Sequence, residues 1–404
     1  MISELRVEGF KSFGPATPPI FLRPLNFVVG ANAAGKTNLV SALRFLRLAL
    51  LQNVECAVGE FDGPTEVRNK ISRERKERKP LRLGVKLANL GLSVGSKGKA
   101  HEIKAMSYEV CIDLRSDDGV PVVQSEKLLA EIHDESGQKA QYSLKRTQQQ
   151  VEIDDPVFRA GEAHQRYDVA KQDATRLAAG SGFFSLPCVI FRNYVEGWSF
   201  FNINPEVARA PAKEVPDVDL GLAGEHLAVI LHKIEQQNGT GAMSAILDGL
   251  RGAVPGFQKI RTRQLPVEGK WAFQVVEEKI RGAINPRSVS DGTIRLLAIL
   301  VIAHWSAKKS TLITLEEPEN GLHPHLSKNI VELMRAASEH RQILVTTHNP
   351  DFLDYLQPNE VILCDKVEGF TKIRHASEVA EIDTFRKRFR LGELWEQGAL
   401  GGIP

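Results

Sequence analysis

One stretch of twelve residues constrains the fold of this chain more than any other part of its sequence. Residues 27–38 read FVVGANAAGKTN, which is an apolar run, then a loop of small residues, then a lysine and a threonine. Gly30, Gly35, Lys36 and Thr37 have the spacing G-x-x-x-x-G-K followed by Ser or Thr. Small side chains let backbone N–H groups converge on phosphate oxygens, and the start of the next helix favours negative charge. The stretch therefore predicts a strand, a phosphate-binding loop and a helix, in that order.

The loop and its flanking residues are candidates for the contacts to a nucleotide. Lys36 is expected to reach the β- and γ-phosphates and to be catalytic, and the Thr37 hydroxyl is expected to bind Mg²⁺. The alternative is a turn rich in glycine and alanine before a buried helix, but the preceding strand and the apolar helix over residues 39–49 favour the phosphate loop. The predicted cofactor-binding residues here are Gly30, Ala31, Asn32, Ala33, Ala34, Gly35, Lys36, Thr37 and Asn38.

Composition and charge argue against several other classes of protein. A hydrophobic content of 42% and a charged content of 25% are typical of a globular protein with a buried core. The net charge of +2 gives no general attraction for nucleic acid, so any such surface must be local. The four cysteines lie far apart and form no C-x-x-C pair, which argues against a zinc site or a disulfide framework. Because no apolar run resembles a signal peptide or a membrane span, we expect a cytoplasmic protein without a membrane partner.

The first residues of the chain add a second pattern. Ile2, Leu5 and Val7 alternate with polar residues as in a strand, and residues 9–13 form a turn. Residues 2–13, followed by the phosphate-binding loop, resemble the head domain of the RecF, SMC, Rad50 and overcoming-lysogenization-defect ATPases. These are ABC-type ATPases of the AAA group that act on DNA or in phage defence. The resemblance implies an α/β fold in which a mixed β-sheet is flanked by helices.

Residues 52–285 show no resemblance of their own, and we expect them to form an insertion with an antiparallel β-lobe and a helical segment. The sequence contains no heptad repeat, so the long coiled coil of an SMC protein is not expected. The expected strands are residues 81–87, 107–114, 122–132, 142–145, 151–153 and 186–194, with a hairpin over 257–265 and 271–280. Helices are expected within residues 157–180, 223–237 and 243–250.

A basic segment from Arg68 to Lys79 lies at the start of this insertion. It contains seven lysines and arginines, mixed with Glu74 and Glu77. One interpretation is an arm that neutralises the phosphates of a nucleic acid. The other is a solvated helix face with mixed charge pairs. No aromatic residues are interleaved, so a platform for stacking bases is not indicated.

A second group of motifs follows residue 285. Residues 288–293, SVSDGT, precede an apolar helix over residues 294–305, and alone they predict only a helix cap. Residues 312–319, LITLEEPE, then read as an apolar strand that ends in two acids. In ABC-type ATPases a signature motif lies just before such a Walker B strand. The resemblance implies that Ser290 and Gly292 bind the γ-phosphate of a nucleotide held by the other subunit of a head-to-tail pair, and a helix N-terminus suits that task.

The two acids have different implied roles. Glu316 is expected to hold Mg²⁺; the family usually has aspartate here, but glutamate supplies the same oxygen ligands. Glu317 is expected to polarise the attacking water. His348 follows the next strand and matches the switch histidine that contacts the γ-phosphate in this family. The alternatives are an exposed strand end for the acids and a histidine at the protein surface.

Residues 319–324 resemble the D-loop, which crosses the dimer interface in this family. His323 and His325 lie in or beside it, but with no cluster of acids or cysteines around them a metal site is not favoured. The chain after His348 is too short for the Toprim nuclease of two-domain defence members, so we expect any effector to be a separate protein. For the tail around Trp395 we consider both a docking segment and a helix packed on the protein's own core.

Together the motifs predict a single ABC-type ATPase head over residues 1–404 that uses ATP and Mg²⁺. Its expected parts are residues 1–51 with the first strand and phosphate loop, the insertion 52–285, the motifs of 286–366, and the tail 367–404.

We expect the protein to form a dimer or higher oligomer by pairing head-to-tail around nucleotide. It is then expected to gate a DNA-related or anti-phage effector, a nuclease or toxin that another protein supplies. The alternatives are a RecF-type DNA repair ATPase and an ATP-dependent scaffold without significant turnover. A transporter subunit is the least favoured.

Overall fold

The computed structural model describes residues 1–71, 79–96, 99–114, 120–158, 162–170, 173–180, 185–216, 218–237, 241–266 and 268–401. It divides into two compact units. The first unit comprises residues 1–23, 30–198 and 362–378, and the second comprises residues 24–29, 199–361 and 379–404. Most of the basic segment, residues 72–78, lies outside the described residues, so the structure does not address the arm predicted there.

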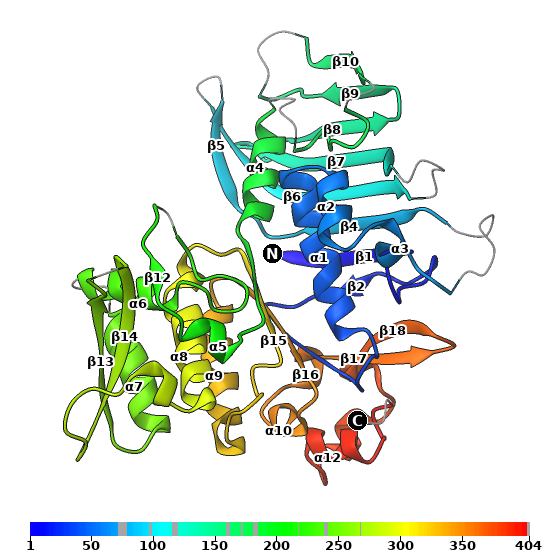
Figure 1. The fold of residues 1–404 in the computed structure, drawn as a ribbon. Coiled ribbons are helices and arrows are strands. Elements are labelled where there is room, and N and C mark those ends of the chain that lie inside the picture. The colour runs from blue at the N-terminus through cyan, green and yellow to red at the C-terminus, as the bar shows by residue number, and fades with distance from the viewer. Residues whose placement is uncertain are drawn as a thin grey trace. The chain divides into compact units, whose positions relative to one another are not determined.

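The first unit is built on a nine-stranded antiparallel sheet (Figure 1). Its order is β10-β9-β8-β7-β6-β4-β1-β2, and β5 pairs separately with β6. The strands are β1 (Ile2–Glu8), β2 (Ile20–Phe21), β4 (Leu81–Leu87), β5 (Leu92–Ser96), β6 (Lys99–Asp113), β7 (Val122–Asp134), β8 (Lys139–Thr147), β9 (Gln150–Asp154) and β10 (His164–Asp168). The expected antiparallel lobe is therefore present, and it is continuous with the first strand of the chain.

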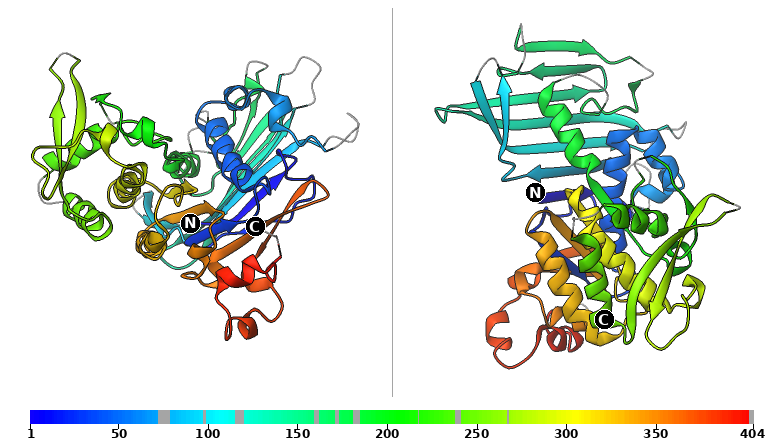
Figure 2. Two further views of the ribbon diagram at one scale, coloured as in Figure 1. Left: turned by 60° about the horizontal axis from the view of Figure 1, so that its bottom comes forward. Right: turned by 90° about the vertical axis from the view of Figure 1, so that its left-hand side faces the viewer.

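Helices α1 (Lys36–Leu51), α2 (Val54–Glu60) and α4 (Leu186–Glu196) lie on one face of this sheet (Figures 1 and 2). The Phe191 ring of α4 stacks on Tyr108 of β6, with 4.7 Å between ring centroids. The unit also contains the short helix α3 (Pro64–Val67), the hairpin of β17 (Val361–Val367) and β18 (Phe370–His375), and the turn η7 (Ala376–Glu378).

Two expectations for this unit are wrong. Residues 186–194 form helix α4 and not a strand. Pro187 lies in the first helical turn, where proline is favoured, and Cys188, Phe191 and Val195 recur on one buried face. Residues 157–180 were expected to be helical, but they contain β10, which pairs with β9. The open edge of β9 offers backbone partners that outweigh the weak helix preference of this polar sequence.

The second unit contains the parallel strands. The strands β11 (Trp198–Phe201), β15 (Leu312–Glu316), β16 (Gln342–Thr347) and β3 (Leu25–Val29) are neighbours in this order, and β15, β16 and β3 run parallel. Helix α9 (Ser327–Ser338) packs on β16 and β3, and α8 (Asp291–His304) packs on α9. The strands β16 and β3 are buried along their whole length, as expected for parallel strands covered on both faces.

A helical region with a small sheet forms the rest of the second unit. The predicted helices and hairpin are all present: α6 (Leu227–Gln236), α7 (Ala242–Ala253), and the pair β13 (Phe257–Gln264) and β14 (Lys270–Glu277), which β12 (Ala212–Lys213) extends. The remaining elements are α5 (Pro205–Ala208), η3 (Pro286–Ser288), η4 (Ser306–Lys308), η5 (Pro324–Leu326), α10 (Pro350–Leu353), η6 (Pro358–Glu360), α11 (Ile382–Phe385) and α12 (Leu391–Glu396). No helix among the described residues is both long and apolar enough to cross a membrane.

Candidate functional site

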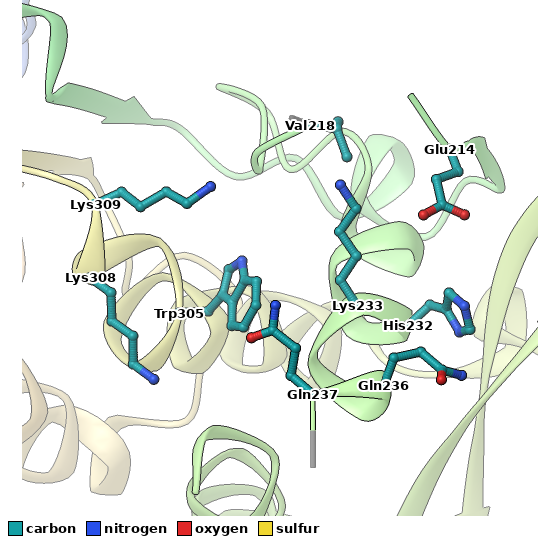
Figure 3. Close-up of a pocket in the computed structure, with 9 residues that line it drawn as sticks. All are labelled: Glu214, Val218, His232, Lys233, Gln236, Gln237, Trp305, Lys308 and Lys309. Carbon is teal, nitrogen blue, oxygen red and sulfur yellow. The ribbon is translucent and has the colours of Figure 1, made fainter. Parts of the chain in front are cut away.

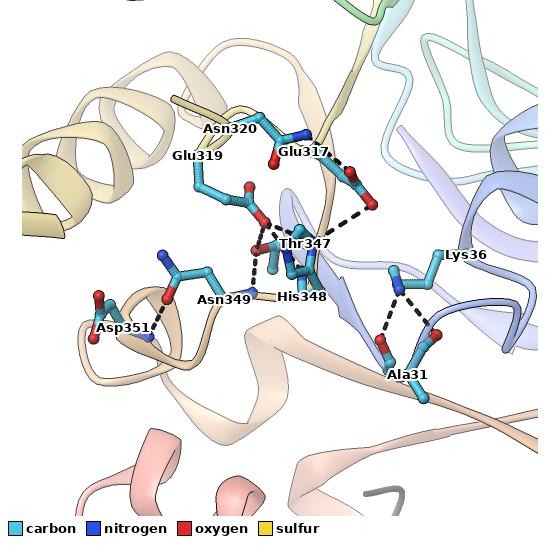
Figure 4. Close-up of polar contacts among 10 residues, drawn as sticks. Ala31, Lys36, Glu317, Glu319, Asn320, Thr347, His348, Asn349 and Asp351 are labelled. Atoms are coloured by element: carbon cyan, nitrogen blue, oxygen red, sulfur yellow. Dashed lines mark hydrogen bonds and ion pairs between the residues drawn. The ribbon is translucent and has the colours of Figure 1, made fainter. Parts of the chain in front are cut away.

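The phosphate-loop motif lies directly before α1, and Lys36 is the first residue of that helix. The Lys36 side chain is buried, with its residue 6% exposed, and its Nζ donates to the carbonyls of Gly30 at 2.7 Å and Ala31 at 3.1 Å (Figure 4). Asn32, Ala33 and Thr37 are exposed. The loop thus presents its tip and the Thr37 hydroxyl to solvent, while the lysine holds its first two carbonyls.

Both motif glycines are required by the β17–β18 hairpin. A Cβ on Gly30 would lie 2.1 Å from the Cys364 carbonyl oxygen. Gly35 has φ +117°, and a Cβ there would lie 2.1 Å from the Thr371 hydroxyl. The same hydroxyl donates to the Ala34 carbonyl at 2.8 Å. Only glycine fits these two positions, so the hairpin fixes the loop from outside the motif.

The N-terminal pattern supports the loop through Ser12. Its hydroxyl lies 2.6 Å from that of Thr371 and accepts a hydrogen bond from Asn38 Nδ2 at 2.7 Å. A cavity of about 600 Å³ lies beside these residues. Its lining includes Ser12 and Asn38, and its charged residues include Lys11, Arg68 and Lys70 as well as the acids Glu60, Asp62 and Glu66. The two motifs that the sequence separates by some twenty residues therefore share one cavity, and the start of the basic segment lines it.

In the second unit, three parallel strands end at one edge of the sheet. Val29 of β3 is opposite Thr347 of β16, and Thr346 is opposite Glu316 of β15. The next residues along the chain are Gly30, His348 and Glu317. In open α/β sheets, ligands bind beyond the carboxyl ends of the strands. The strand register therefore brings the predicted base and the predicted switch histidine to the edge at which β3 also ends.

Glu317 adopts a backbone conformation that is unusual for glutamate. Its φ is +43°, and its N–H donates to the Thr346 carbonyl at 2.8 Å. The carboxylate accepts a hydrogen bond from Asn320 Nδ2 at 2.9 Å and lies 3.5 Å from His348 Nδ1 (Figure 4). The Glu317 and His348 side chains are 36% and 44% exposed, so both are accessible to a ligand. Such strain in a non-glycine residue is found most often at functional sites.

Glu319 is a functional candidate that the sequence analysis assigned only to the D-loop. Its Oε1 accepts hydrogen bonds from the Thr347 hydroxyl at 2.6 Å and from the His348 N–H at 3.0 Å. Its Oε2 is buried and has no hydrogen-bond partner among the described residues. Burial raises the pKa of Glu319, and the two hydrogen bonds oppose that rise. The glutamate thereby fixes the backbone that carries His348, and its only sequence signal is its place two residues after Glu317.

Ser290 caps helix α8, and its hydroxyl accepts the N–H of Thr293 at 3.2 Å. Its side chain is exposed. Gly292 has a packing role, because a Cβ there would lie 2.4 Å from the carbonyl oxygen of Gly321 in the D-loop segment. Arg295 was not singled out from the sequence. Burial lowers the pKa of its guanidinium, while the charges of Glu319, Asp291 and Glu317 raise it. The signature and acidic segments are thus coupled by contact and by charge.

Two further expectations concern His323 and Trp395. The Nδ1 atoms of His323 and His325 lie 2.7 Å apart, but no group of three or more candidate metal ligands occurs among the described residues. Trp395 of α12 is 1% exposed, and α12 packs on α10, which begins two residues after His348. Gly392 N–H donates to Asp354 Oδ1 at 3.0 Å. The interpretation of the tail as a helix packed on the protein's own core is therefore confirmed.

Residues 25–86 and 233–354 match a family described as AAA domain, putative AbiEii toxin, Type IV TA system. The fold is similar to that of solved SMC heads. An SMC head bound to the C-winged helix domain of ScpA has a TM-score of 0.51 and 13% identity, with 93% of this chain and 97% of that chain covered. A Pyrococcus furiosus SMC head with an extended coiled coil is bound to the C-terminal domain of ScpA. It has a TM-score of 0.51 and 12% identity, and the match covers 96% of this chain and 99% of that chain. No curated protein matches the sequence. The predicted fold class is confirmed.

Proposed function

We propose that this chain, whose fold and matched segments support a place among the ABC/AAA ATPases, binds and hydrolyses ATP. One observation carries the proposal. The carboxylate of Glu317 and the imidazole of His348 lie 3.5 Å apart, both accessible, at the ends of adjacent parallel strands. A neighbouring parallel strand leads into the phosphate-loop motif. Phosphoryl transfer to water requires a group that accepts a proton from the water and a group that contacts the phosphate. Glu317 suits the first role and His348 the second.

The oxygen donors present suit Mg²⁺. The Thr37 hydroxyl is exposed at the start of α1, and the Glu316 carboxylate is at the end of β15. Both are hard oxygen ligands of the kind that Mg²⁺ prefers, and Mg²⁺ would supply charge neutralisation to the phosphates. Lys36 and the loop amides from Gly30 to Asn38 bind and orient the phosphates. Glu317 orients a water and takes its proton, and His348 contacts the γ-phosphate.

A variant at Glu317 tests hydrolysis separately from binding. We expect Glu317→Gln to retain ATP binding and to lose about 10²- to 10⁴-fold in turnover, because the amide cannot accept the water proton. Glu332→Gln is the matched control, since Glu332 is an exposed residue of α9. If Glu317→Gln hydrolyses ATP as fast as wild type, the assignment of Glu317 is wrong. Tight ATP binding with no turnover in wild type would favour the alternative of an ATP-dependent scaffold.

Lys36 gives a direct test of the phosphate loop. We expect Lys36→Ala to bind ATP at least tenfold more weakly, because one full positive charge is removed from the phosphate contacts. Calorimetric titration with ATP and Mg²⁺ measures the change. If Lys36→Ala binds ATP with unchanged affinity, the nucleotide does not bind at the phosphate loop.

The second part of the proposal is a head-to-tail dimer around nucleotide. The Ser290 hydroxyl is exposed at the N-terminus of a fourteen-residue helix, which suits it and Gly292 to contact the γ-phosphate held by a second copy. Ser290→Asp keeps a good helix cap but adds a negative charge, whereas Ser290→Asn keeps the cap and stays neutral. In the Glu317→Gln background we expect ATP-dependent dimers from Ser290→Asn, and their loss in Ser290→Asp. Dimers that survive in Ser290→Asp would contradict this contact.

The third part of the proposal is that the ATPase gates a separate effector in a DNA-related or anti-phage process. The description of the matched family refers to a toxin system, and the solved SMC heads carry a bound protein domain. A RecF-type role in DNA maintenance is the alternative. Charge reversal at Arg68 and Lys70, which line the cavity beside the phosphate loop, tests whether this segment contacts DNA. If DNA binding and its salt dependence are unchanged in that variant, this segment is not a nucleic-acid arm.

A further inference from the structure

A pocket in the second unit lies outside both groups of motifs. Its volume is about 520 Å³, within the range of small-molecule sites, and it is formed by the C-terminal ends of α6 and α8, η4 and the segment after β12 (Figure 3). It shares no residue with the cavity beside the phosphate loop or with the cluster around Glu317. Its polar lining includes Lys233, Lys308, Lys309, Gln236 and Gln237, and Trp305 is among the lining residues.

The charge of this pocket favours a ligand of low negative charge. Among the described residues, three lysines line it against one acid, Glu214. Lys233 and Lys308 form no ion pair with any described residue, and Lys309 Nζ is 4.0 Å from Asp219. The C-termini of α6 and α8 each contribute roughly half a negative charge. The described lining residues and helix ends therefore carry at most about one net positive charge, since Asp219 lies beside Lys309, and this suits a phosphate monoester or diester better than a triphosphate.

The aromatic and amide groups favour a base beside that phosphate. Figure 3 shows the Lys233 and Lys309 amines extending to either side of the Trp305 indole, with the Gln237 amide next to the ring. Trp305 is half-buried, so part of its surface is accessible. Stacking on an aromatic ring accepts any base, and a glutamine amide offers both a donor and an acceptor to a base edge.

We propose that this pocket binds a nucleoside monophosphate unit, either as a free nucleotide or at the end of a nucleic-acid strand. Trp305 stacks on the base, Gln236 and Gln237 contact its edge, and Lys233 and Lys309 neutralise the phosphate. An acidic peptide would satisfy the lysines but would leave the indole and the two amides without matching groups. The site is separate from the phosphate loop, so it does not depend on ATP hydrolysis.

Calorimetric titration of the full chain tests the pocket. The Lys36→Ala background removes the contribution of the phosphate loop, and the probes are AMP, a 5′-phosphorylated single-stranded DNA and inorganic phosphate. We expect AMP or the DNA to bind, and the affinity to fall tenfold or more in Lys233→Ala/Lys309→Ala and in Trp305→Ala. Lys328→Ala, an exposed lysine of α9, is the matched control and should change nothing. Circular dichroism melting confirms that each variant is folded, and Lys309→Ala alone replaces the double variant if that one is not.

The probes separate the sources of the ligand. If the DNA binds more tightly than AMP, the ligand of the pocket is the end of a nucleic-acid strand. If AMP binds more tightly, the ligand is a free nucleotide. Inorganic phosphate that binds as tightly as AMP would overturn base recognition. An acidic peptide that binds more tightly than both nucleotide probes, or no binding by any probe, would overturn the proposal.

Discussion

Among the described residues, each unit contains one buried glutamate, Glu126 in the first and Glu319 in the second, and the two differ in how their oxygens are used. Glu126 of β7 accepts the N–H groups of Ala178 at 2.6 Å and Ala179 at 2.9 Å, and the Tyr108 hydroxyl at 3.0 Å. The buried Arg146 guanidinium lies 4.0 Å away. Glu319 uses one oxygen for two hydrogen bonds and has none on the other among the described residues. Burial raises the pKa of both carboxyls.

The difference separates a structural carboxylate from a functional candidate. Buried polar groups in native proteins are nearly always hydrogen-bonded, so an unsatisfied oxygen requires an explanation. Glu126 is satisfied on both oxygens and joins β7 to the segment at residues 178–179. Glu319 keeps acceptor capacity beside His348, where the proposed reaction takes place. We therefore expect substitutions at Glu126 to change stability, and those around Glu319 to change activity as well.

The largest expected effect is at Glu126. Glu126→Ala should lower the free energy of unfolding by about 3–5 kcal/mol, because the buried Arg146 charge then keeps only the backbone carbonyls of Asp173 and Ala174 and loses its carboxylate. The Arg146 side chain is 2% exposed, so water cannot replace the carboxylate. Urea denaturation measures the loss. Glu131→Ala, a half-exposed acid on the same strand, is the control; it removes contacts with His133 and Lys139 and should cost less than about 1 kcal/mol. If Glu126→Ala lowers the free energy of unfolding by less than about 1 kcal/mol, Glu126 is not the structural carboxylate proposed here.

Single hydroxyl donors give a finer test. Tyr108→Phe removes one hydrogen bond to Glu126 and fills the same space, so stability should fall by about 1.5–3 kcal/mol. ATP turnover per folded molecule should stay at the wild-type level. A turnover change larger than the change in folded fraction would show that the lobe also affects the reaction.

Thr347→Val makes the equivalent change at Glu319. It removes the hydroxyl that donates to Glu319 and accepts the Asn349 N–H, and we expect a loss of about 1–2 kcal/mol. Turnover should fall more than stability explains, because the segment carrying His348 loses its anchor. Thr347→Ser retains the hydroxyl and should restore turnover. If the valine and serine variants turn over ATP equally, the Glu319 contact does not position His348.

The phosphate-loop motif and the acids at the end of β15 could be predicted because their spacing is local and their strands are strongly apolar. Residues 186–194 were misread because a short apolar run does not distinguish a strand from a buried helix. Glu319 could not be assigned because its contact with Thr347 joins residues 28 positions apart. The packing of Gly292 on Gly321 likewise depends on tertiary structure, although the glycine itself was identified.

The smallest effect is the pH dependence of Glu319→Gln. Because burial raises the pKa of Glu319 above its ordinary 4.5, the folded protein holds this proton more tightly than the unfolded chain does. The wild-type stability contributed by this group is therefore full at low pH and falls as pH rises from about 4.5 through the folded pKa. Glutamine resembles the protonated carboxyl and does not titrate. The stability difference should thus shift in favour of the variant as the pH rises above about 4.5.

Chemical denaturation at several pH values measures this shift, and Glu332→Gln on the exposed face of α9 corrects for general charge effects. A difference that stays constant with pH would mean that the unpaired oxygen of Glu319 is solvated in the native protein. Both oxygens of Glu319 would then be hydrogen-bonded, as those of Glu126 are, and the two glutamates would differ less than the contacts indicate. A shift in the opposite direction would mean that the hydrogen bonds from Thr347 and His348 outweigh burial. Glu319 would in that case be a purely structural anchor, and Glu317 and His348 alone would form the reactive pair.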